Sequence, residues 1–147
     1  MVKSLYIHIP FCIAKCAYCD FYSVPLGNYG TDASGEYAGA LLKEMELRGG
    51  IAGDLRTVYL GGGTPTLFSS KQVTAILSGT KEIFSIAPGA EITIEANPGT
   101  ISERQLAALR EIGINRISIG IQSLSDHELR TLGRCHTVED SDRKSVV

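Results

Sequence analysis

The sequence lacks the features that would direct it to a membrane or to nucleic acid. No apolar run among its 147 residues approaches the roughly 18 residues of a membrane-spanning helix, and membrane contact is not evident. A formal net charge of −2 provides no basic surface for nucleic acid, so none is expected as a partner. The N-terminal stretch MVKSLYIHIPF is interrupted by His8 and Pro10 and has no small-residue cleavage site, so it predicts a strand and not a signal peptide.

Cysteine is scarce, with four residues in the chain, and no export signal accompanies them. This combination indicates a reducing compartment, so we expect a cytoplasmic protein whose clustered thiols bind metal or do chemistry. Two phosphate-binding patterns are also missing. There is no G-x-G-x-x-G, and the glycine-rich turn that does occur has no following Lys-Ser/Thr, which argues against a dinucleotide fingerprint and a P-loop.

The sequence alternates between two hydrophobic periods, which is typical of an α/β protein. Strand-like runs occur at 4–10, 56–62, 91–97 and 116–122, and helix-like runs at 36–47, 69–84 and 102–113. Capping-box pairs are Ser69 with Gln72, Ser102 with Gln105 and Ser125 with Glu128, and the glycines suited to helix C-termini are Gly113 and Gly133. Residues 23–35 are expected to form a polar loop. The short alternation predicts right-handed βαβ units and a parallel sheet.

The predicted strands each have one apolar side and one polar or small side. In 91–97, for example, Ile92 and Ile94 alternate with Thr93 and Glu95. A parallel sheet covered by helices on both faces would be apolar on both sides. We therefore expect helices on one face and a polar interior on the other, as in a barrel or an open half-barrel. The alternative is an antiparallel sheet with one solvated face, which the helix-length connections disfavour.

Three of the four cysteines lie close together, at Cys12, Cys16 and Cys19, whereas Cys135 is distant in the sequence. Three thiolates can hold an iron–sulfur cubane and leave one iron open for an exogenous ligand. Their loop follows the first predicted strand, at the sheet edge where parallel α/β folds keep active sites. Other interpretations stay open: a zinc site completed by His8 or Cys135, a disulfide with a spare thiol, or a single reactive cysteine.

The run LGGGTPT at 60–66 passes from a predicted strand into three glycines. Glycine lets the backbone approach a ligand closely, and exposed backbone groups in such a turn can bind the charged ends of a small molecule. Taken alone the run is weak evidence, because many turns between a strand and a helix contain glycine.

Five segments together carry a family resemblance: YIHIPFCIAKCAYCDF, GGGTPT, EITIEANP, GINRISIGIQS and LGRCHT. In this order and spacing they resemble the N-terminal part of the HemW family of heme chaperones. These are radical S-adenosylmethionine (radical SAM) proteins, related to oxygen-independent coproporphyrinogen III oxidase. The resemblance implies a partial (βα) barrel of the radical SAM type, with about four βα units present. It also implies a 4Fe-4S cluster, with S-adenosylmethionine as the ligand of its open iron.

The resemblance further implies roles for individual residues. The three cluster ligands would be Cys12, Cys16 and Cys19. The residues expected to bind S-adenosylmethionine or to lie beside it are Tyr6, Tyr18, Gly62, Gly63, Thr64, Glu95, Gln122 and Arg134. Arg134 could pair with a carboxylate through a bidentate fork. His8 is expected to line the site and fix the cluster loop, whereas Cys135 and His136 acquire no role.

The family offers two activities. A heme chaperone hands heme to an acceptor, whereas the oxidase uses a radical from S-adenosylmethionine to remove hydrogens from propionate side chains. The oxidases have a further cysteine two positions after the third ligand, where this sequence has Phe21, and a longer segment before the cluster motif. Both differences favour the chaperone. The partners implied are heme or a porphyrin, an unidentified heme acceptor protein, and an electron donor such as a flavodoxin or ferredoxin.

The resemblance covers 1–138, which we expect to be the radical SAM core, and 139–147 is a polar tail that departs from the family pattern. The family's barrel has six βα units followed by a further domain, so an incomplete barrel with an unpaired edge and marginal stability is expected. Outside this function, the alternatives are a small zinc-binding module and an inactive fragment.

Overall fold

The computed structural model describes residues 2–30 and 32–145. The strands are β1 (Val2–Ile9), β2 (Phe11–Cys12), β3 (Val24–Pro25), β4 (Ala52–Gly62), β5 (Ile86–Ala96) and β6 (Arg116–Ile119). The helices are α1 (Ala33–Arg48), α2 (Ser70–Ile83), α3 (Glu103–Glu111), α4 (Asp126–Thr131) and α5 (Val138–Ser145). Single turns of 3-10 helix span Leu26–Asn28, Gly49–Ile51, Pro65–Leu67 and Pro98–Thr100.

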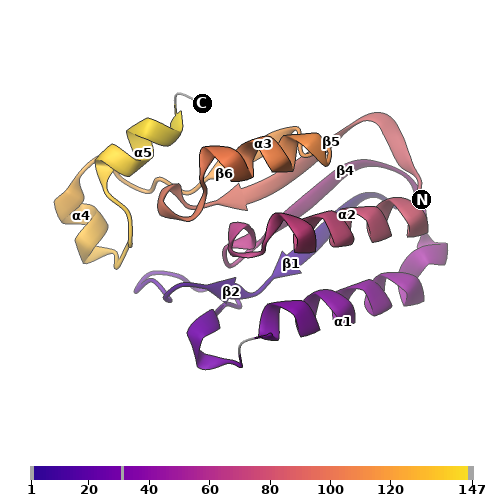
Figure 1. Ribbon diagram of the computed structural model, residues 1–147, viewed down its shortest axis with the longest axis horizontal. Coiled ribbons are helices and arrows are strands. Elements are labelled where there is room, and N and C mark those ends of the chain that lie inside the picture. Colours follow the sequence, from indigo (N-terminus) through magenta and orange to yellow (C-terminus); the bar gives the residue numbers. More distant parts are fainter. Residues whose placement is uncertain (1, 31, 146–147) are drawn as a thin grey trace.

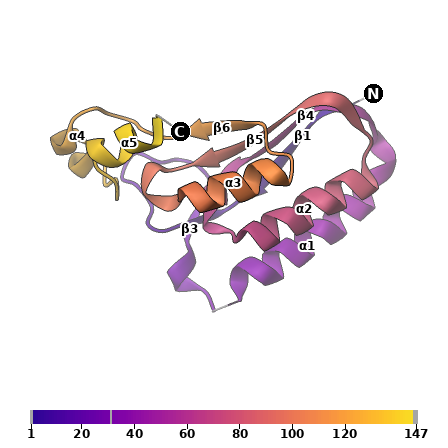
Figure 2. The same ribbon diagram turned by 45° about the horizontal axis from the view of Figure 1, so that its top comes forward.

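The four long strands form one sheet in the order β1-β4-β5-β6, and all three neighbouring pairs are parallel. Strands β2 and β3 form a separate short pair beside the cysteine loop. Figure 1 shows α1, α2 and α3 side by side across the sheet, and Figure 2 shows that all three lie on the same side of it. Helix α2 packs between α1 and α3. The predicted parallel α/β fold is confirmed.

The core fills the space between the sheet and this helix layer. Its buried members from the strands and helices include Ile7, Ile9, Val58, Leu60, Ile92, Ile94, Val73, Ile76, Leu77 and Leu109. Burying an aliphatic side chain of this kind stabilises the fold by about 1.5–3 kcal/mol. The apolar side of each predicted strand therefore faces the helices.

The other face of the sheet is polar and aromatic, and none of the three helices α1 to α3 lies on it (Figure 2). Tyr6 on β1 and Tyr59 on β4 stack there with their ring centroids 6.0 Å apart. Glu95 on β5 lies on the same face, where it accepts a hydrogen bond from Tyr59. The predicted division between a helix-covered face and a polar face is thus confirmed.

Several predicted boundaries differ from the structure. Helix α1 begins at Ala33, inside the expected loop 23–35, and β4 and β5 begin earlier than predicted because irregularities in register carry the pairing toward their N-terminal ends. Strand β6 ends at Ile119, not at Gln122, because Gln122 adopts a left-handed φ of 70°. Two close backbone hydrogen bonds, from Ile121 N to Ile119 O and from Ser123 N to Ile121 O, turn the chain there.

The predicted helix caps are present. The side chains of Ser69, Ser102 and Ser125 accept hydrogen bonds from the amides of Gln72, Gln105 and Glu128, respectively. At Ser69 the glutamine side chain also bonds back to the serine amide, which completes the capping box. Gly113 and Gly133 follow α3 and α4 with φ of 106° and 72°, as expected of glycines that end helices.

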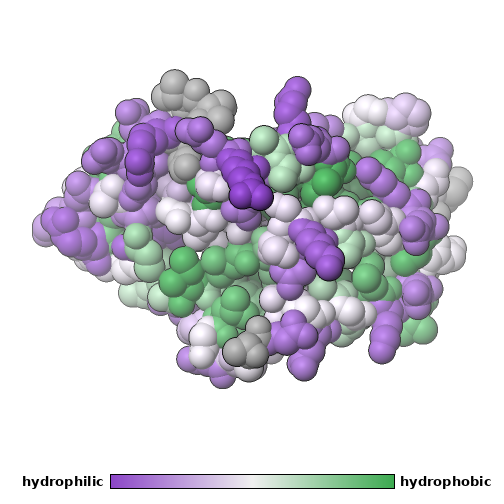
Figure 3. All heavy atoms as spheres, in the orientation of Figure 1, coloured by the Kyte–Doolittle hydropathy of each residue, from purple (hydrophilic) through white to green (hydrophobic). Residues whose placement is uncertain are grey.

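Residues 139–145 of the predicted polar tail belong to α5, which lies next to α4 at one end of the molecule (Figure 1), and residues 146–147 lie outside the described structure. That end is largely hydrophilic on the face drawn in Figure 3, in keeping with the composition of the tail. Among the helices in residues 2–30 and 32–145, none has the length and apolar character needed to cross a membrane.

Candidate functional site

A cavity of about 300 Å³ lies at the C-terminal ends of the strands. Its walls come from the cysteine loop after β1, the glycine-rich end of β4, the end of β5, and the end of β6 with the segment that follows it. The predicted site residues that line it are Cys12, Cys16, Cys19, Gly62, Gly63, Thr64, Glu95, Gln122 and Arg134. Residues from four separate strand ends therefore meet at one place.

The cysteine loop is held at its base by backbone hydrogen bonds. The amides of Gly63 and Thr64 donate to the carbonyls of Ile9 and Phe11, each at 2.7 Å. The three thiols of the loop are free and partly exposed. The end of β4 thus fixes the start of the loop while leaving its sulfurs open to the cavity.

The glycines at the end of β4 are required by close contacts. Gly62 has a φ of 114°, and a Cβ there would lie 2.5 Å from the His8 ring. A Cβ on Gly63 would lie 2.5 Å from the carbonyl oxygen of Phe11. Since real Cβ atoms do not approach so closely, only glycine lets the strand end pass beside β1 and the cysteine loop.

Glu95 is fixed by two donors. The Tyr59 hydroxyl donates to Oε1 at 2.6 Å, and the Gly62 amide donates to Oε2 at 2.9 Å. Burial raises the pKa of Tyr59, and the hydrogen bond to Glu95 and the charge of its carboxylate raise it further. Tyr59 therefore keeps its proton and acts as a donor, so the carboxylate is held in one orientation at the cavity wall.

Arg134 places a positive charge against the cysteine loop. Its Nη2 donates to Asn97 Oδ1 at 2.6 Å and to the carbonyl oxygen of Gly120 at 2.7 Å. Its Nη1 donates to Cys16 Sγ at 3.6 Å and to the Tyr18 hydroxyl at 3.4 Å. One end of the guanidinium is thus anchored on the ends of β5 and β6 while the other faces a sulfur.

Two buried side-chain atoms in the described part of the chain have no hydrogen-bond partner, and both belong to residues that line this cavity. They are Ser23 Oγ and Arg134 Nε. Leaving a buried polar group unpaired costs about 1–3 kcal/mol. Thiolates are the usual ligands of iron–sulfur clusters, and the three cavity-lining cysteines can supply them. The residues present therefore fit a cluster together with a small polar molecule.

Within residues 2–30 and 32–145, no three Cys, His, Asp or Glu side chains converge where a single metal ion could sit. The ligands of a cubane bind different irons and surround a volume, so they do not need to converge on one point. His8 is engaged elsewhere, and Cys135 is exposed and lies outside the cavity lining. A zinc site completed by either residue is not formed in the described structure.

Two predicted site residues, Tyr6 and Tyr18, do not line the cavity. Tyr6 lies along the polar face of β1 and donates to His8 Nδ1 at 3.0 Å. Tyr18 lies on the cysteine loop and accepts from Arg134. Gln122 does line the cavity, but it reaches it from beyond the end of β6 and not as a residue of the strand.

His8 anchors the cysteine loop, as predicted, but it is not among the residues that line the cavity. Its Nε2 donates to the carbonyl oxygen of Tyr22 at 2.8 Å. A carbonyl oxygen can only accept, so Nε2 carries the proton and Nδ1 accepts from Tyr6. The imidazole thus joins β1 to the far end of the loop.

Three polar side chains of the cavity lining were not predicted as site residues: Ser23, Asn97 and Ser118. A signal was available for two of them. Asn97 continues the polar alternation that runs through Thr93 and Glu95, and Ser118 lies on the polar side of the strand at 116–122. Ser23 lies in the segment 23–35, which was expected to form a polar loop, and no periodic pattern distinguishes it from its neighbours there.

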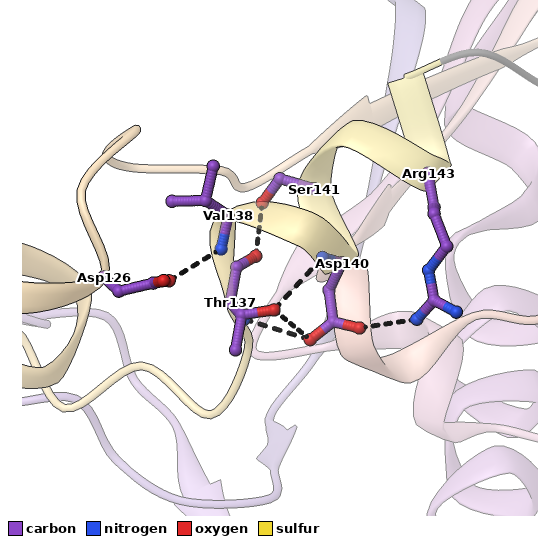
Figure 4. Close-up of polar contacts among 6 residues, drawn as sticks. All are labelled: Asp126, Thr137, Val138, Asp140, Ser141 and Arg143. Atoms are coloured by element: carbon purple, nitrogen blue, oxygen red, sulfur yellow. Dashed lines mark hydrogen bonds and ion pairs between the residues drawn. The ribbon is translucent and has the colours of Figure 1, made fainter.

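His136, which the sequence left without a role, is buried and anchors the chain after α4. Its Nε2 donates to the carbonyl oxygen of Ile121 at 3.1 Å, and burial lowers its pKa. The adjacent Thr137 caps α5 through reciprocal bonds with Asp140, and Asp126 accepts from the Val138 amide at 2.8 Å (Figure 4). These contacts fix the segment that carries Arg134 relative to the end of β6.

Comparison with known proteins gives a consistent result. The model of the Radical SAM superfamily matches residues 6–144. The heme chaperone HemW of Escherichia coli is 41% identical over 142 residues, covering 95% of this chain and 37% of the relative. The heme chaperone HemW of Synechocystis is 39% identical over 146 residues, covering 97% of this chain and 35% of the relative.

A solved structure of coproporphyrinogen III oxidase (HemN) from Escherichia coli, described as a radical SAM enzyme, superposes with a TM-score of 0.85 at 31% identity. The superposition covers 94% of this chain and 32% of that one. The chain therefore spans about a third of the length of the relatives it matches.

Proposed function

Because this chain belongs to the radical SAM superfamily, we propose that its cavity holds a 4Fe-4S cluster on Cys12, Cys16 and Cys19 together with S-adenosylmethionine. The observation that carries the proposal is that all three cysteines line one cavity together with charged residues, Glu95 and Arg134. When bound, such a cluster supplies the electron that cleaves the sulfonium of S-adenosylmethionine reductively.

The residues of this chain would bind and orient the small molecule. Arg134 lines the cavity, and bonds to Asn97 and Gly120 hold its guanidinium in place, so it presents a fixed positive charge that suits a carboxylate. Glu95 presents a fixed negative charge that suits an ammonium or hydroxyl group. Tyr6 and Tyr18, outside the lining, would act through His8 and Arg134, whose side chains they contact.

We favour a heme chaperone that delivers heme to an acceptor. The two HemW relatives above are 41% and 39% identical to this chain, whereas the coproporphyrinogen oxidase is 31% identical. Phe21 also stands where the oxidases carry a further cysteine, and its side chain is 64% exposed at the cavity. Oxygen-independent coproporphyrinogen III oxidation is the second candidate, favoured by the close superposition on that enzyme.

The partners in this proposal are heme or a porphyrin, a heme acceptor protein, and an electron donor such as a flavodoxin or ferredoxin. We also propose a cytoplasmic location. The support is that Cys12, Cys16, Cys19 and Cys135 are all free thiols, which persist in a reducing compartment.

The first test is anaerobic reconstitution with iron and sulfide, followed by electron paramagnetic resonance of the dithionite-reduced protein with and without S-adenosylmethionine. We expect a cluster signal that changes when S-adenosylmethionine is added. Cys12→Ala, Cys16→Ala and Cys19→Ala should each lose the cluster, whereas the matched control Cys135→Ala should retain it. Binding of zinc in place of a cluster, or equal loss in Cys135→Ala, would contradict the proposal.

The second test separates the two activities. Reconstituted protein is incubated anaerobically with hemin and a heme-free acceptor, and in parallel with coproporphyrinogen III, reductant and S-adenosylmethionine. A chaperone binds hemin and transfers it without forming protoporphyrinogen. Decarboxylated product in the second reaction would instead support the oxidase.

A further inference from the structure

Two of the three cysteine sulfurs receive a hydrogen bond from a neighbouring side chain. The hydroxyl of Thr64 donates to Cys12 Sγ at 3.7 Å, and Nη1 of Arg134 donates to Cys16 Sγ at 3.6 Å. Thr64 comes from the end of β4 and Arg134 from the segment after α4, so the two donors are far apart in the sequence. A third residue holds both of them.

That residue is Asn97, at the end of β5. Its Nδ2 donates to Thr64 Oγ1 at 3.0 Å, and its Oδ1 accepts from Arg134 Nη2 at 2.6 Å. The orientation of the amide follows from chemistry, because a guanidinium can only donate and must face the oxygen. The nitrogen then faces Thr64, whose hydroxyl accepts this bond and keeps its own proton for Cys12.

The backbone of Asn97 is itself fixed. Its amide donates to Thr100 Oγ1 at 3.2 Å, and the Thr100 hydroxyl donates back to the Asn97 carbonyl at 2.9 Å. The side chain therefore projects from a rigid turn. Around it, a Cβ on Gly120 would lie 3.0 Å from Asn97 Oδ1 and 3.4 Å from Arg134 Nη2, so the pair is closely packed.

We propose that Asn97 is a positioning residue that directs Thr64 and Arg134 at two cysteine thiolates and thereby raises the reduction potential of the cluster they hold. The inference rests on the proposed cluster. Reduction adds negative charge to a cluster, and hydrogen bonds and positive charge at its sulfurs stabilise that form. Because a bond accepted by a hydroxyl strengthens the bond that it donates, loss of Asn97 weakens the Thr64 donor as well as releasing Arg134.

The test compares Asn97→Ala with wild-type protein after reconstitution, using a redox titration followed by electron paramagnetic resonance. We expect the variant to be harder to reduce by roughly tenfold in the equilibrium constant, which is about 59 mV for a one-electron couple. The matched control is Asn115→Ala. The Asn115 amide also makes two bonds, to Ile92 N and Ala90 O at 2.8 Å each, but it does not line the cavity, so the potential should stay unchanged.

Variants of Thr64 show whether Asn97 acts through its neighbours. Thr64→Val should lower the potential, and Thr64→Ser, which keeps the hydroxyl, should restore most of it. Adding Asn97→Ala to the Thr64→Val protein should lower the reduction potential by less than Asn97→Ala lowers it in the wild type, because the hydrogen bond from Thr64 to Cys12 is already absent. If Asn97→Ala loses the cluster, the Thr64 pair still tests the donor at Cys12.

The outcomes separate this inference from the proposed function. A wild-type protein that takes up no cluster would overturn both. A wild-type cluster whose potential is the same in Asn97→Ala, or moves equally in Asn115→Ala, would overturn the role of Asn97 alone. Strict additivity of the Thr64→Val and Asn97→Ala shifts would also contradict it.

Discussion

Replacing Gly62 by alanine should damage the site through a contact that the structure specifies. Gly62 has a φ of 114°, and adopting such a conformation costs a residue with a side chain about 1–3 kcal/mol. The new Cβ would also lie 2.5 Å from the His8 ring. Moving that ring breaks the bond from Nε2 to Tyr22 O, at a further cost of about 0.5–1.5 kcal/mol. We therefore expect a loss of about 1.5–4.5 kcal/mol, a large share of the roughly 5–15 kcal/mol that stabilises a typical domain.

The matched control for Gly62→Ala is Gly89→Ala. Gly89 also has a positive φ, 75°, but a Cβ there would meet nothing within 4 Å, so only the backbone strain remains. The free energy of unfolding in urea and the iron bound after reconstitution are measured for both variants. Together they separate the effect of backbone strain from that of the contact with His8. Only Gly62→Ala should displace the cysteine loop and lower the iron content. Combining Gly62→Ala with His8→Ala should remove the contact part of the cost. Equal losses in the two glycine variants, or no relief in the double variant, would refute the reasoning.

Three further predictions concern stability. The pKa of Tyr59 is raised above 10.0 in the folded state. The stability that Tyr59 contributes is therefore present below pH 10.0 and is lost as the pH rises through the folded-state pKa. In alkaline titrations, the unfolding free energy of Tyr59→Phe should decline less than that of the wild type. Burial lowers the pKa of His136 below 6.5, so the unfolded chain binds the proton first and the unfolding free energy should fall as the pH drops below 6.5. In acid titrations of the unfolding free energy, His136→Gln should lose this dependence. Ile94 is 0% exposed in the core, so Ile94→Ala should cost about 2–5 kcal/mol in urea unfolding, and a loss below 1 kcal/mol would contradict its central position.

The arrangement of strands and helices follows from patterns that the sequence displays openly. Alternation in the strand of Ile92 and Ile94 separates the helix-covered face from the polar face, since side chains point to opposite sides of a strand. Glycines such as Gly113 mark helix ends because their left-handed conformation is local. These features depend on neighbours in the sequence, and the structure agrees with them.

The parts that the sequence did not predict depend on contacts between distant segments. The residue Gln122 continues the alternation of its strand in the sequence, yet a left-handed turn takes it out of the strand. Alternation places Asn97 on the polar side of its strand, but its role depends on Thr64 and Arg134, which lie 33 and 37 positions away. Tyr6 and Tyr18 were expected to bind S-adenosylmethionine or to lie beside it; in the structure neither lines the cavity, and they contact His8 and Arg134, respectively.

The assembly of the cavity explains why the cysteine motif cannot be judged from spacing alone. The loop that holds Cys12, Cys16 and Cys19 is bounded by bonds to the end of β4, its far end is held by His8, and its sulfurs face donors positioned from the end of β5. Each of these anchors is a strand end, and the strands are adjacent in the sheet. Sliding one strand by a single residue would reverse which side chains face the cavity. The register of the sheet therefore determines whether three thiols become a ligand set, and variants that disturb it should lose iron before they lose the fold.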